Sequence, residues 1–220
     1  MASSTATERK LVLKMSVSLD GFVCGPNGEL DWIFRTRGAD SMAWVLNTLH
    51  EAGVHIMGSR TYYDMATFWP YSDSPLAPAM NDIPKVIFSR SGLKDGTVVD
   101  GTRALADAKK ERIGHRADVT PTAAVLRSWA EPTVARGNLA EEVLGLKAQP
   151  GSFLLAHGGA GFARSLVASG LIDEYRLVFH PVVLGRGQPL FSGLHSPVDL
   201  RLISATPFDT GVVAAVYQPA

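Results

Sequence analysis

Short apolar runs alternate with longer amphipathic segments over most of this chain. The apolar runs lack helical periodicity and end in polar or glycine-containing turns, which predicts buried strands over residues 11–18, 53–57, 85–88 and 153–156. The amphipathic segments predict helices over residues 40–50, 139–147 and 162–169, with a short helix after residue 59. Asp40, Ser59 and Asn138 are the expected N-caps, and Glu141 completes a capping box with Asn138. Alternating strands and helices predict parallel β-α units.

The last third of the chain has a different pattern. Three apolar runs follow one another without a helix between them, over residues 174–180, 200–205 and 212–217. The final two are separated by a short turn segment, which predicts an antiparallel hairpin. The expected fold is therefore α/β, with a mixed, mostly parallel sheet, helices on both faces and a C-terminal antiparallel hairpin.

Two segments do not fit this alternation. Residues 1–9 offer little to bury and are expected to form a loose tail. Residues 93–130 mix charges with glycine, so we expect an inserted surface excursion with helices of its own over residues 103–112 and 121–129. We expect residues 1–220 to form a single domain.

Composition narrows the class of partner. Of the 220 residues 46% are hydrophobic and 19% charged, and the formal net charge is zero, so bulk electrostatics do not support a nucleic-acid or membrane partner. The single cysteine, Cys24, excludes an intramolecular disulfide and a cysteine-based zinc site, and we expect no metal. No apolar stretch has the length of a signal peptide or a membrane span, so we expect a cytoplasmic protein that binds a small molecule.

A glycine cluster carries the first chemical signal. His157-Gly158-Gly159-Ala160-Gly161 follows the apolar run 153–156 and precedes an expected helix. Glycines let the backbone approach an anion, and the free N–H groups of a helix N-terminus favour a phosphate there. A turn that serves packing alone is the alternative.

Four further motifs extend this signal along most of the chain, each at the end of a predicted strand. The four motifs are residues 17–22, 58–62, 88–90 and 180–187, and residues 157–160 are the fifth. In these motifs the chain resembles the dihydrofolate reductase-like family, whose other well-known branch is the C-terminal reductase domain of riboflavin biosynthesis (the RibD C-terminal domain). The resemblance implies the three-layer fold of dihydrofolate reductase and an NADPH-dependent reductase that binds its cofactor at the carboxyl ends of the strands.

The resemblance also implies which residues bind NADPH. Those expected at the pyrophosphate and 2′-phosphate are Gly58, Ser59, Arg60, Thr61, Ser89, Arg90, Gly158, Gly159, Ala160 and Gly161. Two arginines near one ligand favour NADPH over NADH, because the additional phosphate requires positive charge. Ser16, Ser18 and Val23 are expected beside the nicotinamide.

On the substrate side the chain departs from true dihydrofolate reductases. Trp32 matches the tryptophan of that family, but the carboxylate expected five residues later is replaced by Arg37, which argues against dihydrofolate itself. Asp31 is the candidate acid if the fold turns it inward, and Asp20 is expected to shape the closing loop or to form a turn with its own backbone. His180 is either a substrate-binding donor or a packed turn residue.

Two functions stay open from the sequence. One is an NADPH-dependent reductase of a small pterin-like or pyrimidine-like heterocycle, which binds near Trp32. The other is a non-catalytic NADPH-binding module that acts as a sensor or assembly component. Edge strands near the C-terminus, and the dimers that members of the family form, predict a homodimer.

Overall fold

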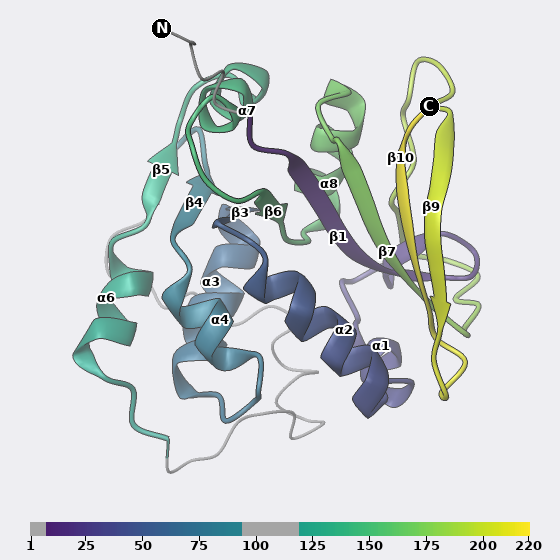
Figure 1. The fold of residues 1–220 in the computed structure, drawn as a ribbon, viewed down its shortest axis with the longest axis horizontal. Coiled ribbons are helices and arrows are strands. Elements are labelled where there is room, and N and C mark those ends of the chain that lie inside the picture. The colour runs from purple at the N-terminus through teal and green to yellow at the C-terminus, as the bar shows by residue number, and fades with distance from the viewer. Residues whose placement is uncertain (1–7, 94–118) are drawn as a thin grey trace, which may run out of the picture.

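An eight-stranded sheet forms the middle of the protein in the computed structural model, which describes residues 8–93 and 119–220 (Figure 1). The strand order is β5-β4-β3-β6-β1-β7-β10-β9. Six strands are parallel, and β10 and β9 add an antiparallel hairpin. The strands are β1 (Leu11–Ser18), β3 (Val54–Gly58), β4 (Lys85–Phe88), β5 (Thr133–Ala135), β6 (Leu154–Ala156), β7 (Glu174–His180), β9 (Leu200–Pro207) and β10 (Val213–Pro219). The predicted mixed sheet and its C-terminal hairpin are confirmed.

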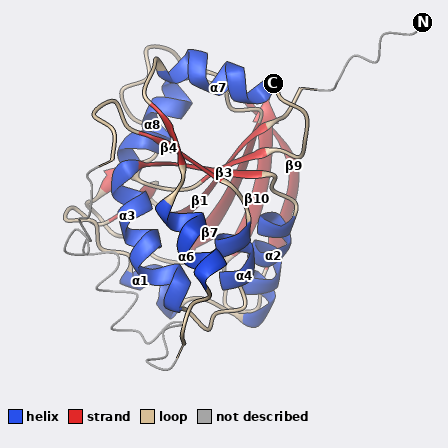
Figure 2. Ribbon diagram, turned by 90° about the vertical axis from the view of Figure 1, so that its left-hand side faces the viewer, coloured by secondary structure: helices blue, strands red, loops and turns tan. Residues whose placement is uncertain are grey.

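Helices cover both faces of the sheet, so the predicted three-layer arrangement is confirmed (Figure 2). Four helices lie on one face: α2 (Ala39–His50), α3 (Ser59–Phe68), α4 (Ala77–Asp82) and α6 (Ala123–Ala130). The opposite face carries α7 (Leu139–Lys147) and α8 (Ala160–Ser169).

The alternation of side chains along β1 divides the core. Leu11 and Leu13 are fully buried against residues of α7 and α8, whereas Val12 packs with residues of α2 and α4. Successive strand residues point to opposite faces, so a strand covered on both sides must be apolar throughout. Lys14 interrupts that pattern on the face of Val12.

Several short elements have no counterpart in the sequence prediction. They are β2 (Phe22–Cys24), which pairs with β8 (Gln188–Pro189) in a separate two-stranded sheet, α1 (Asp31–Arg35), the 3₁₀ turn η1 (Trp69–Tyr71) and the edge strand β5. Segments of two to five residues are too short for a periodic signal. Tertiary contacts decide their conformation instead.

Two expected N-caps are wrong. Helix α2 begins at Ala39 after Gly38, and Asp40 lies inside its first turn, where its carboxylate accepts a bond from the Asp209 N–H at 2.9 Å. Helix α3 begins at Ser59 itself, after Gly58.

The third expected cap, Asn138, is confirmed. Its side-chain oxygen accepts from the N–H groups of Ala140 and Glu141 at the start of α7. The acid that bonds back to the backbone before the helix is Glu142, at 2.8 Å from the Gly137 nitrogen, and not Glu141.

Helix α6, at the end of the expected 93–130 excursion, packs against the core. Trp129 of α6 is 3% exposed, and its indole N–H donates to the Asn81 side chain at 2.7 Å. Tyr62 of α3 donates its hydroxyl proton to the Trp129 carbonyl. The helix expected over residues 103–112 lies outside the described residues.

The expected tail over residues 1–9 is too long at its C-terminal end. Arg9 is buried, and its guanidinium donates to the Ser152 carbonyl at 2.6 Å. Its backbone N–H also donates to the Lys147 carbonyl at 2.8 Å. Glu8 is exposed, and residues 1–7 of that tail lie outside the described part of the chain.

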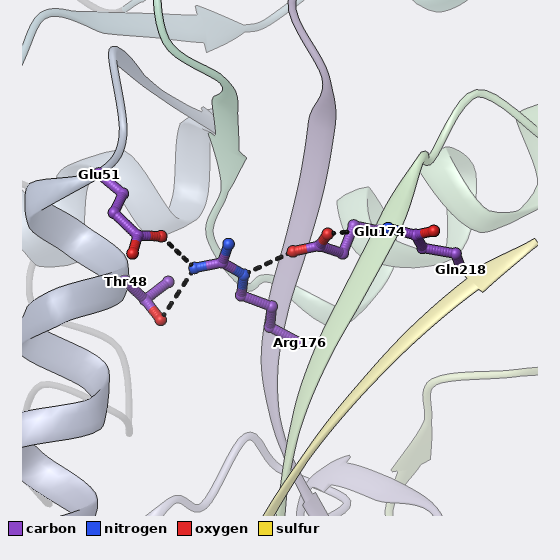
Figure 3. A network of polar contacts seen from close by, with 5 residues as sticks. All are labelled: Thr48, Glu51, Glu174, Arg176 and Gln218. Atoms are coloured by element: carbon purple, nitrogen blue, oxygen red, sulfur yellow. Dashed lines mark hydrogen bonds and ion pairs between the residues drawn. The ribbon is translucent and has the colours of Figure 1, made fainter. Parts of the chain in front are cut away.

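A polar network ties α2 to the sheet at the amino-terminal end of β7 (Figure 3). The Arg176 guanidinium contacts the Glu51 and Glu174 carboxylates at 2.8 and 2.7 Å and the Thr48 hydroxyl at 3.3 Å. Gln218 of β10 donates to Glu174. This network lies at the opposite end of β7 from His180.

Within the described ranges no helix is long and apolar enough to cross a membrane, and no group of three or more His, Cys, Asp or Glu side chains is arranged to hold a metal ion.

Candidate functional site

The predicted motifs meet at one edge of the sheet. Strands β1, β3, β4, β6 and β7 are parallel neighbours or near neighbours, so their carboxyl ends lie on the same side (Figure 1). Each of the five motifs begins at or directly after one of these ends. Ligands of open α/β sheets bind at such an edge, which makes it the candidate site.

Two helix N-termini lie against each other at this edge. Helix α3 follows Gly58 and α8 follows Gly159, and neither has a side-chain cap on its free N–H groups. The Thr61 hydroxyl donates to the Gly158 carbonyl at 2.9 Å and so joins the two turns. Among the other described helices, α6 and α7 are capped by Thr122 and Asn138, whereas the short helices α1 and α4 also lack a side-chain cap. Uncapped N–H groups and the positive ends of two helix dipoles favour an anion.

Gly159 is the residue that permits this approach. Its φ of 97° lies in the region that only glycine adopts freely, and a Cβ there would stand 2.6 Å from the Thr61 hydroxyl oxygen. Any other residue would therefore push the glycine turn away from α3.

Arg60 and Arg90 are exposed, and neither forms an ion pair or side-chain hydrogen bond with the rest of the described chain. Ser89 is engaged locally, because its hydroxyl donates to the Gly92 carbonyl at 2.6 Å. The Ser89 side chain therefore stabilises its own turn. No described residue therefore competes with an anion for the two arginines.

The loop after β1 is held by Asp20. Its carboxylate accepts from the Ser18 hydroxyl at 2.7 Å and from the backbone N–H groups of Leu184 and Gly185 at 3.1 and 2.7 Å. These bonds, the one from Ser18 above all, lower the pKa of Asp20. Asp20 is therefore ionised near neutral pH and clamps two loops together, beyond the local turn considered from the sequence.

The three residues expected beside the nicotinamide lie in different environments. Ser18 is fully buried and its hydroxyl accepts from the Phe22 N–H at 3.0 Å. Ser16 is partly exposed, and its hydroxyl has no partner among the described side chains and backbone groups. Val23 is 4% exposed and packs in the core on the α8 side of the sheet.

His180 and Trp32 form a buried aromatic contact at the end of β7. The ring centroids are 5.2 Å apart with the planes at 87°, and Trp32 is 1% exposed. The Nδ1 atom of His180 lies 2.7 Å from the Thr36 hydroxyl, whereas its buried Nε2 atom has no partner in the described structure. Burial, and secondarily the charge of Lys14, lower the pKa of His180 to about 4, so the ring is neutral at pH 7.

Asp31 does not turn inward. Its side chain is 45% exposed and forms an ion pair with Arg35 one helical turn later, at 3.6 Å. The condition for Asp31 as a proton donor to a buried ring is therefore not met. Arg37, which replaces the carboxylate of dihydrofolate reductases, is also exposed.

Lys14 is a site residue that the sequence analysis missed. It lies on β1 two residues before Ser16, on the same face, without an ion pair or hydrogen bond in the described ranges. Burial lowers its pKa to about 8, and its charge lowers the pKa values of His157 and His180. A lysine inside an otherwise apolar strand was the available signal.

His157, at the start of the glycine turn, is hydrogen-bonded to His55 of β3. The distance from His157 Nε2 to His55 Nδ1 is 2.5 Å, and His55 Nε2 donates to the Ala79 carbonyl of α4 at 3.2 Å. Both rings are buried, which lowers both pKa values. The two neutral imidazole rings therefore anchor the glycine turn to β3 and α4.

Comparison with solved structures supports the assignment of the fold. A putative riboflavin biosynthesis protein from Shewanella sp. PV-4 superposes with a TM-score of 0.67 at 18% identity, over 96% of this chain and 99% of that one. The diaminohydroxyphosphoribosylaminopyrimidine deaminase/5-amino-6-(5-phosphoribosylamino)uracil reductase of Thermotoga maritima gives 0.65 at 16% identity, over 97% of this chain and 57% of that one. Dihydrofolate reductase from Enterococcus faecalis, complexed with NADP(H), gives 0.55 at 11% identity and 96% coverage of each chain.

Sequence comparison gives the family. The uncharacterized protein YyaP of Bacillus subtilis is 28% identical over 211 residues, 96% of this chain and 95% of YyaP. The family model described as the RibD C-terminal domain matches residues 9–214. The chain therefore belongs to the RibD C-terminal domain family of NADPH-dependent reductases, which has the dihydrofolate reductase-like fold.

Proposed function

We propose that this protein is an NADPH-dependent reductase that transfers a hydride to a small pterin-like or pyrimidine-like heterocycle. The observation that carries the proposal is the pair of uncapped helix N-termini joined by the Thr61–Gly158 hydrogen bond, with Arg60 and Arg90 beside them and without a side-chain partner among the described residues. Membership of a family of NADPH-dependent reductases supports it.

The donor set fits the phosphates of NADPH. The first-turn N–H groups of α3 (Ser59, Arg60, Thr61) and of α8 (Ala160, Gly161), together with the small surfaces of Gly58, Gly158 and Gly159, would hold the pyrophosphate. Arg60 and Arg90 would lie on the 2′-phosphate side, with Ser89 positioning the turn that carries Arg90.

When bound, NADPH supplies the hydride, so the protein mainly needs to orient two rings and exclude water. Ser16 offers a hydroxyl, without a partner in the described ranges, on the sheet surface where we place the nicotinamide. Ser18 acts through Asp20 and the loop that both residues hold, and Val23 supports that loop from the core.

We place the substrate near Lys14 and His180, with Trp32 as an apolar wall. His180 pairs in register with Ser18 of β1, and Lys14 and Ser16 lie on the same strand and face as Ser18. The Lys14 ammonium group, with its pKa of about 8, is charged at pH 7 and favours a ring that presents an acceptor such as a carbonyl oxygen. The name of the Thermotoga maritima enzyme supports a pyrimidine-like ring, and the fold shared with dihydrofolate reductase supports a pterin-like one.

A non-catalytic NADPH-binding module is the second candidate. The observation in its favour is that Asp31 is ion-paired on the surface, while Arg37 occupies the place of the carboxylate of dihydrofolate reductases. Such a module would bind NADPH but would not oxidise it, whichever heterocycle is added.

Nucleotide binding and turnover separate these cases. We expect purified protein to bind NADPH more tightly than NADH by fluorescence titration, and Arg60→Ala to lose at least about tenfold in NADPH affinity, the effect of a charged hydrogen bond. Arg201→Ala, a change on the distant strand β9, is the control. NADPH oxidation in a panel of pterins and pyrimidines then supports the reductase, whereas binding without oxidation supports the module. Failure to bind either nucleotide contradicts both.

A further inference from the structure

Three neighbouring strands, β3, β4 and β5, end at the same level of the sheet. Gly58 of β3 is paired with Phe88 of β4, and Phe88 is paired with Ala135 of β5. Adjacent strands lie about 4.8 Å apart, so the residues that follow these three share one corner of the carboxyl edge. The short strand β5, which the sequence did not reveal, brings a third chain segment to this corner.

Each of the three exits carries an arginine. Arg60 and Arg90 follow β3 and β4 by two positions, and Arg136 directly follows β5. All three are exposed, and none forms a hydrogen bond through its side chain or an ion pair with another described residue. Like charges at one corner repel one another, so this corner favours an anion with more than one negative charge.

The Arg136 side chain is directed toward the turn that carries Arg90. The Ser89 N–H donates to the Ala135 carbonyl at 3.0 Å, and the Gly92 N–H donates to the Ser89 carbonyl at 3.1 Å. Gly92 has a φ of 78°, and a Cβ there would stand 2.9 Å from Arg136 Nη2, so the guanidinium group covers this glycine.

The neighbouring acid does not neutralise Arg136. The Glu142 carboxylate accepts from the Gly137 N–H at 2.8 Å and serves the start of α7. The guanidinium of Arg136 thus contacts the turn without an anionic partner from the described chain.

We propose that Arg136 binds the 2′-phosphate of NADPH together with Arg60 and Arg90, and that it contributes to the preference for NADPH over NADH. This inference rests on the proposed function. A phosphate monoester carries a charge of about −1.5 to −2 at pH 7, and the planar guanidinium fork binds its oxygens in pairs. NADH has a hydroxyl group at this position and gives Arg136 no charge to bind.

The test compares Arg136→Ala with the wild type in fluorescence titrations with NADPH and NADH. We expect Arg136→Ala to weaken NADPH binding about tenfold, as for loss of a charged hydrogen bond, and to change NADH binding less than about twofold. Arg136→Lys keeps the positive charge but lacks the planar guanidinium group, so its NADPH affinity should lie between those of the wild type and Arg136→Ala. The matched control is Arg127→Ala, an exposed arginine on α6, which should leave both affinities unchanged.

A second probe isolates the phosphate itself. Adenosine 2′,5′-bisphosphate should lose affinity in Arg136→Ala, and adenosine 5′-monophosphate should not. Unchanged NADPH binding in Arg136→Ala, or an equal loss for NADPH and NADH, overturns the role of Arg136 while wild-type NADPH binding and the Arg60→Ala loss still stand. A wild-type protein that binds neither dinucleotide contradicts the proposed function, and the role of Arg136 with it.

Discussion

Gly159 combines a positive φ with a close contact, and both depend on the absence of a side chain. We expect Gly159→Ala to lower the free energy of unfolding by about 1–3 kcal/mol, because alanine is strained at this φ and its methyl group would meet Thr61. NADPH binding should weaken as well, since the turn must move. Urea denaturation and nucleotide titration measure the two effects.

Gly161 is the matched control for the stability measurement. It lies two residues later in the first turn of α8, and a Cβ there would meet nothing within 4 Å. Gly161→Ala should therefore keep the protein folded and raise its stability by about 0.4–1 kcal/mol through reduced freedom of the unfolded chain. Equal losses in both variants would contradict the role of Gly159.

The buried His55–His157 pair predicts a pH dependence of stability. Burial lowers the folded-state pKa of His55 to about 4 and that of His157 well below its usual value, whereas both are near 6.5 in an unfolded chain. Below about pH 6.5 the unfolded state therefore binds more protons than the folded state. The free energy of unfolding is thus highest above about pH 6.5 and falls as the pH drops towards 4. For His55 the loss is on the order of 3 kcal/mol.

Urea midpoints between about pH 7 and pH 4.5 measure this slope. The His55→Gln variant removes one titrating group and should show a shallower dependence than the wild type. His195→Gln, at an exposed position, is the control for replacing a histidine by glutamine. A wild-type midpoint that does not vary over this range would contradict the neutral pair.

At the scale of elements, α6 is held by one large side chain. Trp129 packs with Met57, Tyr62 and Ile87, and Lys85 places its ammonium group 4.5 Å from the centre of the indole ring. We expect Trp129→Ala to lower the free energy of unfolding by about 3–5 kcal/mol in thermal or urea denaturation, because it leaves a cavity and removes the donor to Asn81 Oδ1. Leu126→Ala on the same helix, where the side chain is 44% exposed, should cost about 0.5 kcal/mol or less. Similar losses of stability in Trp129→Ala and Leu126→Ala would contradict the role of Trp129 in holding α6 to the core.

The sequence predicts the elements that are long enough to repeat a pattern. β1 and β7 have the predicted bounds, and α7 begins after the predicted cap. The strands β2, β5 and β8 span two or three residues, and their pairing partners alone define them. Glycine also replaces the expected capping side chain before α2 and α3, which a propensity argument does not anticipate.

The site shows the same division. The motifs predict which loops meet, because parallel strands end at one edge. They do not predict side-chain direction, which packing determines: Asp31 faces solvent beside Arg35, and the Ser89 hydroxyl bonds within its own turn. Lys14 escaped notice because it lies inside an apolar run.

At the scale of the whole molecule, β9 is an edge strand: it pairs with β10, and its outer edge has no partner strand within the described ranges. All its residues after Leu200 are exposed, including Leu202 at 51% and Ile203 at 43%. An open edge of this length with apolar side chains pairs readily with another strand. We therefore predict a homodimer in which β9 contacts β9 of a second copy.

Light scattering coupled to size-exclusion chromatography tests this prediction. The wild type should have the mass of a dimer, and Leu202→Glu combined with Ile203→Lys should have that of a monomer, since charges on an edge strand oppose pairing. Leu144→Glu, an exposed leucine of α7, should leave the dimer intact. A monomeric wild type would contradict the prediction.

The position of β1 has a consequence for synthesis. It precedes every other described strand in the sequence, yet its neighbours are β6 and β7, so Leu11 and Val12 can pair with Leu154 and Glu174 only after those residues have been made. At about 5–20 residues per second, the ribosome needs roughly 10–30 s to make those partners. A nascent chain that stops before β6 therefore carries an apolar strand with neither neighbour, and the sheet can close around β1 only after β7 has been made.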